Sequence, residues 1–524
     1  MEQETIQKKK VVDFFLKKNI LLSSDILGSL EEKDLETQYT LITQKIKLEN
    51  FLFFNKDLRE AIQKSPPIDI NWFDLEKSRA LLEKGTDNKI YSQFLRFILA
   101  QKTKAKEKKV NIIFSYEEDS KKRGIQDFVQ YFNARYQSIE KILRTRPELQ
   151  NITTINRVLN KRDRETLSLI GIVADKQKTK NGNLMLRIED QTGTINVLVN
   201  KNKPEIFEEA KSIVLDEIIG INGVNGENII FANKIIWPEI SFKELKKSQD
   251  EAYAIFLSDL HVGSKNFLPE AFNKFLKWIN QETGNEKQKE IASKVQYIFI
   301  VGDLVDGCGI YPDQDKELTI DDVHQQYKEC ARLLGQIPQN ITLIICPGNH
   351  DAMRIAEPQP PLYKDFAMPI YDLPNIVSVS NPSLVNIHSS ENFSGFDILL
   401  YHGYSFDYFV ANVDSIRNNG GYDRADLIMK FLLKRRHLAP THTSTLYVPD
   451  VKKDPLVITK IPDFFITGHI HKSIAANYKN VTLISGSCWQ SRTTFQEKVG
   501  HHPEPGRVPI ANLKTREIKI LKFL

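Results

Sequence analysis

Residues 464–472 read FFITGHIHK, an apolar run that stops at Thr467-Gly468 and is followed at once by His469 and His471. A short apolar run of this kind is typical of a buried strand, where an imidazole without a partner is costly. Side chains at positions i and i+2 of an extended chain point to the same side, so the two histidines can face one target. We expect that target to be a metal ion beyond the end of the strand.

The same arrangement occurs four more times upstream. Four apolar runs end beside residues that can bind metal: YAIFL (253–257), VQYIFIV (295–301), ITLIIC (341–346) and FDILLY (396–401). The residues that follow these runs are, in chain order, Asp259, His261, Asp303, Asp306, Asn349, His350, Asp351 and His402. Ligands of open α/β sheets bind beyond the carboxyl ends of the strands, so five neighbouring ends predict one shared site.

The expected ligands combine carboxylate and amide oxygens with imidazole nitrogens and include no thiolate. This mixture suits Mn²⁺, Fe or Zn²⁺, and its imidazole content disfavours a Ca²⁺ or Mg²⁺ cage. The set is too large for one ion, so we expect two divalent metal ions. Asp303 is the natural bridge, because a carboxylate has two oxygens to share. A single Gly-x-His is ordinarily accidental, whereas five such strand ends in order are specific.

The ordered motifs D-x-H, G-D-x-x-D, G-N-H-D, H-G and G-H-x-H resemble those of the calcineurin-like metallophosphoesterases, from about residue 252 to the end of the chain. The resemblance implies that one metal ion is held by Asp259, His261, Asp303 and His471. It implies that the other is held by Asp303, Asn349, His402 and His469. It further implies that His350 faces the substrate phosphate as a catalytic residue, oriented by Asp351 or Asp306.

Several longer stretches resemble the small subunits of archaeal D-family DNA polymerases. They are GDLVDGCGIYPDQ (302–314), CPGNHDAMRIAEPQPPL (346–362), LLKRRHLAPT (432–441), WQSRTTFQ (489–496) and, upstream, IGIVADKQKTKNGNLMLRIEDQTGTINVLV (170–199). The resemblance implies a manganese-dependent 3′-to-5′ exonuclease that removes single-stranded or mismatched DNA 3′ ends, which is proofreading. It implies a heterodimer with a large catalytic polymerase subunit, and a sliding clamp is a further expected partner.

Two other functions stay open. The related B-subunits of eukaryotic replicative polymerases have lost their metal ligands, so a catalytically silent scaffold of the same polymerase is one alternative. A stand-alone phosphatase or nucleotidase is the other. The chain keeps a metal-binding residue at every ligand position, which favours activity over a scaffold, and the barrel described next disfavours a stand-alone phosphatase.

The expected fold is a multi-domain α/β chain. Residues 1–64 have apolar residues at helical spacing and predict a small helical module. Residues 65–160 are expected to be a charged linker region, containing the run KTKAKEKK (102–109). Residues 161–242 hold five short β-rich runs separated by KNGN, QTGT and NGEN, which predict an OB-fold β-barrel. The resemblance implies a calcineurin-like phosphoesterase β-sandwich flanked by helices at 250–524.

The composition limits the remaining possibilities. A net charge of +5 on 524 residues gives no global basic field, so any DNA contact must be local. Arg354, Arg435 and Arg436 are candidate DNA-binding residues, although the last two could instead complement a helix C-terminus. The four cysteines form no C-x-x-C pair, and we find neither a signal peptide nor an apolar run of about 18–20 residues. We therefore expect a cytoplasmic location and no membrane partner.

Overall fold

The structure is a computed structural model that describes residues 2–18, 20–23, 26, 35–45, 52–54, 110–117, 121–161, 164–498 and 500–524. The chain divides into two units, residues 1–107 and 108–524. Residues 65–109 of the expected linker, with the run KTKAKEKK, lie outside the described residues. Within the described part of the chain, no helix is both long enough and apolar enough to cross a membrane.

The first unit contains helices α1 (Glu2–Leu16) and α3 (Leu35–Lys45), which agree with the helical module expected from the sequence. It also contains a parallel pair of short strands, β1 (Ile20–Leu22) and β2 (Leu52–Phe54), which the sequence did not predict. Val11, Phe15 and Ile42 belong to the small buried core of this unit.

A six-stranded sheet in the second unit has the strand order β12-β11-β10-β9-β18-β19. Its strands are β9 (Tyr253–Leu257), β10 (Val295–Val301), β11 (Thr342–Cys346), β12 (Ile376–Ser378), β18 (Arg507–Asn512) and β19 (Ile518–Lys522). Strands β9 to β12 run parallel, whereas β18 pairs antiparallel with β9. The carboxyl ends of the four parallel strands therefore lie at the same edge.

A second six-stranded sheet has the order β16-β17-β15-β14-β13-β3. Its strands are β3 (Asn111–Phe114), β13 (Ser383–Ile387), β14 (Phe396–Leu400), β15 (Phe464–Thr467), β16 (Ile474–Tyr478) and β17 (Val481–Ser485). The two sheets share one fully buried core, in which the ring of Phe256 stacks on Phe299 of its own sheet and on Phe464 of the other. This packing forms a β-sandwich.

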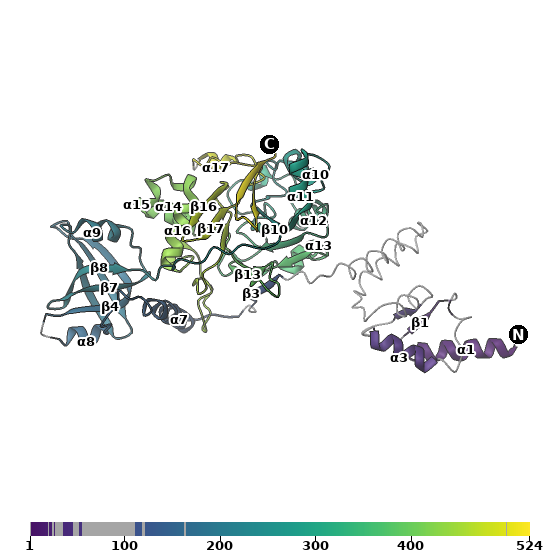
Figure 1. Cartoon of the computed structure of the whole chain (residues 1–524), viewed down its shortest axis with the longest axis horizontal. Coiled ribbons are helices and arrows are strands. Elements are labelled where there is room, and N and C mark those ends of the chain that lie inside the picture. Colours follow the sequence, from purple (N-terminus) through teal and green to yellow (C-terminus); the bar gives the residue numbers. More distant parts are fainter. Residues whose placement is uncertain are drawn as a thin grey trace. The chain divides into compact units, whose positions relative to one another are not determined.

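Helices cover both outer faces of the sandwich (Figure 1). One face carries α10 (Pro269–Ile279), α11 (Glu286–Ser293), α12 (Val323–Leu334) and α13 (Lys364–Tyr371). The opposite face carries α14 (Phe406–Asn412), α15 (Asp414–Arg417) and α16 (Ala425–Arg435). A short helix, α17 (Thr494–Lys498), lies in the segment between β17 and β18. The predicted multi-domain α/β class is confirmed.

The predicted small barrel is also confirmed. Its strands are β4 (Thr166–Lys178), β5 (Leu184–Asp190), β6 (Gly193–Val199), β7 (Ile218–Asn225) and β8 (Ile229–Ile236). They close in the order β4-β5-β6-β8-β7, around a core that includes Leu169, Ile188 and Val197. Helix α9 (Pro204–Lys211) follows β6, and α8 (Ile155–Leu159) contributes Ile155 and Val158 to the same core.

The described part of the expected linker differs from that expectation. Strand β3 pairs with β13, and α7 (Ile125–Leu143) is an amphipathic helix whose buried side contacts both the barrel and the sandwich. The Tyr136 hydroxyl donates to the Ile170 carbonyl of the barrel at 3.0 Å, and Arg135 forms an ion pair with Asp454. The physical reason is an amphipathic pattern: buried residues recur at three- and four-residue spacing along α7.

Candidate metal centre

The loops after five parallel strands bring the predicted ligands together. Strands β9, β10 and β11 are neighbours in one sheet, and β14 and β15 are neighbours in the other. Because the two sheets pack face to face, the loops at their carboxyl ends meet at one edge of the sandwich. All seven predicted ligands lie in these loops: Asp259, His261, Asp303, Asn349, His402, His469 and His471.

The first group of ligand atoms consists of Asp259, His261 and His471, whose side-chain donor atoms all lie within 4.8 Å of one another. The Nε2 atoms of His261 and His471 are 3.0 Å apart, and Nε2 of His471 lies 3.4 Å from Oδ1 of Asp259. Two imidazole nitrogens at this distance repel each other unless a proton or a cation lies between them. This donor set therefore fits a divalent cation.

The second group consists of Asp303, His402 and His469, joined by Asn349. Oδ1 of Asn349 lies 3.0 Å from Nε2 of His402 and 3.0 Å from Nδ1 of His469. Oδ2 of Asp303 lies 3.2 Å from Nε2 of His402 and 3.9 Å from Nε2 of His261 in the first group. Asp303 thus stands between the groups, as a shared ligand must.

The two central carboxylates are buried without a cationic side chain of their own. Asp259 is 0% and Asp303 is 1% exposed. In the described part of the chain, their ion pairs are made only with histidines, and neither pairs with a lysine or an arginine. A buried carboxylate needs such a partner or a metal ion, so the composition of the cluster fits two divalent cations.

The backbone is strained at the same positions. Asp259, His261, Asp303, His469 and His471 have φ values of 51°, 51°, 53°, 71° and 56°, in the left-handed region that non-glycine residues rarely adopt. Each such residue costs on the order of 1–3 kcal/mol, and such strain is concentrated at functional sites. Asp303 also lies so close to residue 348 that only glycine fits there, because an added Cβ would lie 2.2 Å from Oδ1 of Asp303.

Each histidine of the cluster has its second ring nitrogen held by another group. His402 bonds to the Val301 carbonyl at 2.8 Å, and His261 bonds to Asp306 at 3.1 Å. The two remaining pairs are His469 with Asp407 at 2.9 Å and His471 with Gln496 at 3.0 Å. The oxygen acceptors beside His402, His261 and His469 fix the tautomer of each ring and leave its other nitrogen for a metal ion. Gln496 instead donates its Nε2–H to Nδ1 of His471, so this contact fixes the ring orientation only.

His350 lies beside the cluster, and its ring centre is 4.6 Å from that of His261. Its Nδ1 lies 2.8 Å from the Asp306 backbone carbonyl, which can only accept, so Nδ1 carries the hydrogen. Of the two residues expected to orient His350, Asp306 contacts it, through its backbone carbonyl and not through its carboxylate. The Asp306 carboxylate meets His261, and the Asp351 carboxylate accepts from the Gly348 N–H and the Tyr327 hydroxyl.

The charges of the cluster shift the pKa values of its members in opposite directions. Burial raises the pKa of Asp303, but the charges of His402 and His350 lower it more, to well below its usual range. Burial lowers the pKa of His402, but the charge and hydrogen bond of Asp303 raise it to about 10. Burial and the Asp303 charge together raise the pKa of Asp351 to about 7. The cluster therefore favours ionised carboxylates with positive charge around them.

A buried polar network behind the second group was missed by the sequence reasoning. Asn381 accepts from the His402 backbone N–H at 2.9 Å and donates to Gln359 at 2.8 Å, and Gln359 donates to the Gly348 carbonyl at 3.0 Å. This network ties together the loops that carry Asn349 and His402. No local signal identifies it, because its members come from loops outside the five motifs.

Glu357 belongs to that network and gives a pH-dependent prediction. Burial raises its pKa to about 7, although hydrogen bonds from Thr445 and Tyr401 lower it. An unfolded glutamate has a pKa of about 4.3, so the unfolded state releases this proton first and stability falls as the pH rises from about 4 to 7, by up to about 4 kcal/mol. We expect the urea unfolding midpoint of Glu357→Gln to rise, relative to that of the unsubstituted protein, when the pH is raised from 5 to 8. An equal difference at both pH values would contradict this.

The three candidate DNA-binding arginines differ in their burial and in their partners. Arg435 and Arg436 are only 3% and 5% exposed, so the expected phosphate contact is corrected. Arg435 pairs with Glu217 of the barrel and donates to the Ser212 carbonyl, and Arg436 donates to the Ile458 carbonyl at 2.6 Å. Arg435 therefore joins the barrel to the sandwich, whereas Arg436 holds the segment at Ile458 within the sandwich domain. Arg354 is half-buried, donates to the Pro358 carbonyl and stays a candidate for phosphate contact.

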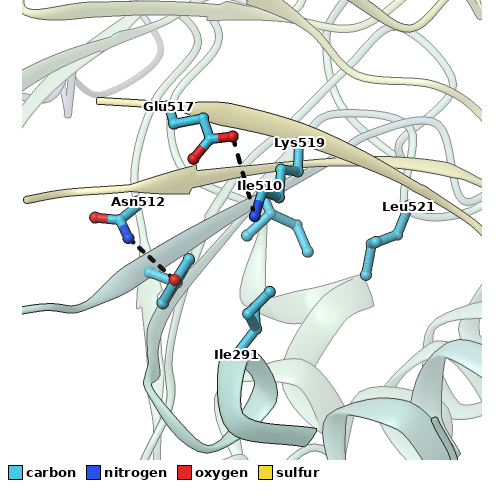
Figure 2. A pocket seen from close by; sticks show the side chains of 7 residues that line it. Ile291, Ile510, Asn512, Glu517, Lys519 and Leu521 are labelled. Atoms are coloured by element: carbon cyan, nitrogen blue, oxygen red, sulfur yellow. Dashed lines mark hydrogen bonds and ion pairs between the residues drawn. The ribbon is translucent and has the colours of Figure 1, made fainter. Parts of the chain in front are cut away.

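A small cavity lies away from the cluster, against the outer strands β18 and β19 (Figure 2). Its volume is about 10 Å³, which is room for about one water molecule. Ile291, Ile510 and Leu521 line it, and Lys519 is paired with Glu517 beside it. None of the predicted site residues lies there, so it does not compete with the cluster as a functional site.

The sequence was compared with known proteins. The profile of the DNA polymerase alpha/epsilon B-subunit family matches residues 254–475. The chain is 40% identical over 399 residues to the DNA polymerase II small subunit of Methanothermobacter thermautotrophicus, covering 76% of this chain and 80% of that protein. It is 38% identical over 403 residues to the DNA polymerase II small subunit of Pyrococcus furiosus, covering 76% of this chain and 64% of that protein.

Similarity to solved structures is partial. An archaeal phosphodiesterase matches 51% of this chain and 98% of its own, with 13% identity and a TM-score of 0.24. The S. pombe Stn1–Ten1 complex matches 15% of this chain and 60% of its own, with 14% identity and a TM-score of 0.14. At these TM-scores, neither similarity supports a function.

Proposed function

This chain belongs to the family of archaeal DNA polymerase II small subunits, and from that membership and the metal-type cluster we propose that it is a metal-dependent 3′-to-5′ exonuclease. Its substrate would be a phosphodiester bond at a single-stranded or mismatched DNA 3′ end. Its partner would be the large catalytic subunit of the same polymerase, with a sliding clamp as a further partner. Its activity would be proofreading.

The observation that carries the proposal is the pair of buried carboxylates, Asp259 and Asp303, surrounded by four imidazoles. A scaffold subunit has no use for two buried carboxylates that pair only with histidines or for five strained backbone positions, because both reduce stability. The same residues would hold a cation in each group, with Asp303 shared. Manganese is the first choice, because the donors are mixed oxygen and nitrogen and the family resemblance implies it; Fe and Zn²⁺ are accepted by the same donors.

The residues around the cluster would have separate roles in phosphodiester hydrolysis. The two groups of residues would hold divalent cations, which would activate a water molecule and stabilise charge on the phosphate oxygens. His350 presents Nε2 to the substrate, because its Nδ1 is held by the Asp306 carbonyl. When protonated, Nε2 can bind a phosphate oxygen or give its proton to the leaving 3′-oxygen. Arg354, four residues further on, could bind the phosphate of the same strand.

The five-stranded barrel supports the polymerase assignment over a stand-alone phosphatase. We propose that it is an OB-fold, because its strands close in the order first, second, third, fifth and fourth, with a helix after the third. A small-molecule phosphatase has no need of a barrel joined to its sandwich by an amphipathic helix and by the buried Arg435.

A 5′-labelled single strand tests both the activity and its direction. The protein, alone and with the large subunit, is incubated with Mn²⁺ or with EDTA. A ladder of progressively shorter labelled strands that requires Mn²⁺ is the expected result. Immediate release of a labelled mononucleotide would reverse the proposed polarity. Rapid hydrolysis of a small phosphomonoester without action on DNA would favour a phosphatase, and an inert protein that binds no metal would favour a scaffold.

His350→Ala and His469→Ala separate catalysis from metal binding. Both should lose nuclease activity, by roughly 10²- to 10⁴-fold for loss of the general acid. His350 also gathers with His261 and Asp306 in a third group of possible ligands, but its Nδ1 is held by the Asp306 carbonyl. We therefore expect that only His469→Ala loses bound manganese. Metal content after gel filtration, measured by mass spectrometry, checks this. An equal loss of metal in both variants would contradict the role given to His350.

A further inference from the structure

Asp407 is a carboxylate at the metal cluster that lies outside all five sequence motifs. It stands in the first turn of α14, five residues after His402, and its Oδ2 lies 2.9 Å from Nε2 of His469. His469 presents its other nitrogen, Nδ1, to Oδ1 of Asn349 at 3.0 Å. One imidazole therefore joins Asp407 on its outer side to the second ligand group on its inner side.

The contact has a direct chemical consequence for His469. A carboxylate accepts a hydrogen bond, so the hydrogen of the neutral ring must lie on Nε2, and the lone pair of Nδ1 is left free. Tyr422 provides a second hydrogen bond to Asp407, and its ring packs against His501 with the centres 4.0 Å apart. Asp407 is thus held from two sides, by His469 and by Tyr422, which come from separate segments of the chain.

We propose that Asp407 is a positioning residue for the second metal site: it fixes the tautomer and orientation of His469 and thereby sets the affinity of that site. The inference rests on the proposed function, because it requires the cluster to bind metal. Asp306 has the same relation to His261 in the first group, at 3.1 Å. Each half of the centre therefore has one histidine supported by a carboxylate.

A purely structural role for Asp407 makes a different prediction. Its side chain is 48% exposed, so it is not needed to fill the core. As an acidic residue in the first turn of α14, it could merely favour the helix N-terminus. In that case its removal would lower the unfolding midpoint and leave metal affinity unchanged.

Manganese titration of the full-length chain, followed by electron paramagnetic resonance, distinguishes the two roles. In Asp407→Asn we expect one of two bound Mn²⁺ ions to weaken by about 10- to 100-fold and the other to keep its affinity. Asp414→Asn is the matched control, because Asp414 occupies the first turn of α15 and pairs only with Arg417 in the described part of the chain. This control should bind both ions as the unsubstituted protein does.

A second variant and three further results separate the inference from the proposed function. Tyr422→Phe, which removes only the hydroxyl, should weaken the same ion by a smaller factor, and this keeps the test available if Asp407→Asn folds poorly. Unchanged affinity for both ions in Asp407→Asn would overturn the inference. Two Mn²⁺ ions bound without nuclease activity would contradict the proposed function alone, whereas failure of the unsubstituted protein to bind Mn²⁺ would overturn both.

Discussion

Replacing Asp303 by asparagine is expected to abolish nuclease activity and to remove tight binding of both metal ions. The Asp303 carboxylate faces histidines of both ligand groups, at 3.2 Å from His402 and 3.9 Å from His261. An amide keeps the size of the side chain and an oxygen for the His350 backbone N–H, which donates to Oδ1 at 2.8 Å. What it removes is the negative charge and the second oxygen.

The expected size follows from what metal ions contribute to phosphoryl transfer. Stabilisation by several kcal/mol corresponds to a rate loss of roughly 10³-fold or more. The measurement is Mn²⁺-dependent degradation of a labelled single strand, together with metal content and an unfolding curve. Asp414→Asn, an exposed substitution of the same kind, should leave all three unchanged. An Asp303→Asn variant that kept both ions would show that Asp303 is not the bridge.

Replacing Asp454 by alanine is expected to cause the largest loss of stability. Its carboxylate accepts from Arg135 at 2.6 Å, from Tyr131 at 2.8 Å and from His437 at 2.7 Å, and all four side chains are buried. Removal leaves the guanidinium of Arg135 buried and unpaired, which typically costs about 3–5 kcal/mol. This network fixes α7 to the sandwich, so its loss should also loosen the barrel.

Urea unfolding followed by circular dichroism measures the effect as a lower midpoint. The control is Asp414→Ala, which breaks an exposed pair with Arg417 and should leave the midpoint unchanged. A loss smaller than about 1 kcal/mol in Asp454→Ala would mean that the network does not hold α7.

The sign of the pH dependence follows from the pKa of Asp454. Burial raises it, but the charges of Arg135 and His437 lower it more, so the folded pKa lies below its usual value. Such a carboxyl contributes stability above the unfolded pKa of about 3.9, and this contribution is lost as the pH falls towards the folded pKa. The difference between Asp454→Ala and the unsubstituted protein should therefore shrink below about pH 4.

The five strand ends, and the convergence of the residues that follow them, could be predicted from the sequence. The reason is that each motif is local: a buried strand and the polar residues that follow it are contiguous, and parallel strands share an edge. The barrel was accessible for the same reason, since turn signals separate its five strands.

What the sequence did not supply depends on contacts between distant segments. Asp407 and Gln496 gain their roles from His469 and His471, which another loop carries. The same holds for Arg435, whose basic character predicted a DNA contact. Its partner, Glu217, is more than 200 residues away in sequence and lies in the barrel. Helix α7 was assigned to the charged linker region because that prediction followed the composition of the whole region. The amphipathic pattern of the helix itself was not used.

An anomalous difference map from crystals grown with Mn²⁺ tests the central claim most directly. We expect two peaks on either side of Asp303, one beside Asp259, His261 and His471, the other beside Asn349, His402 and His469. Crystals that show no anomalous peak at these residues, while manganese is present at saturating concentration, would contradict the claim that these loops form a two-metal centre.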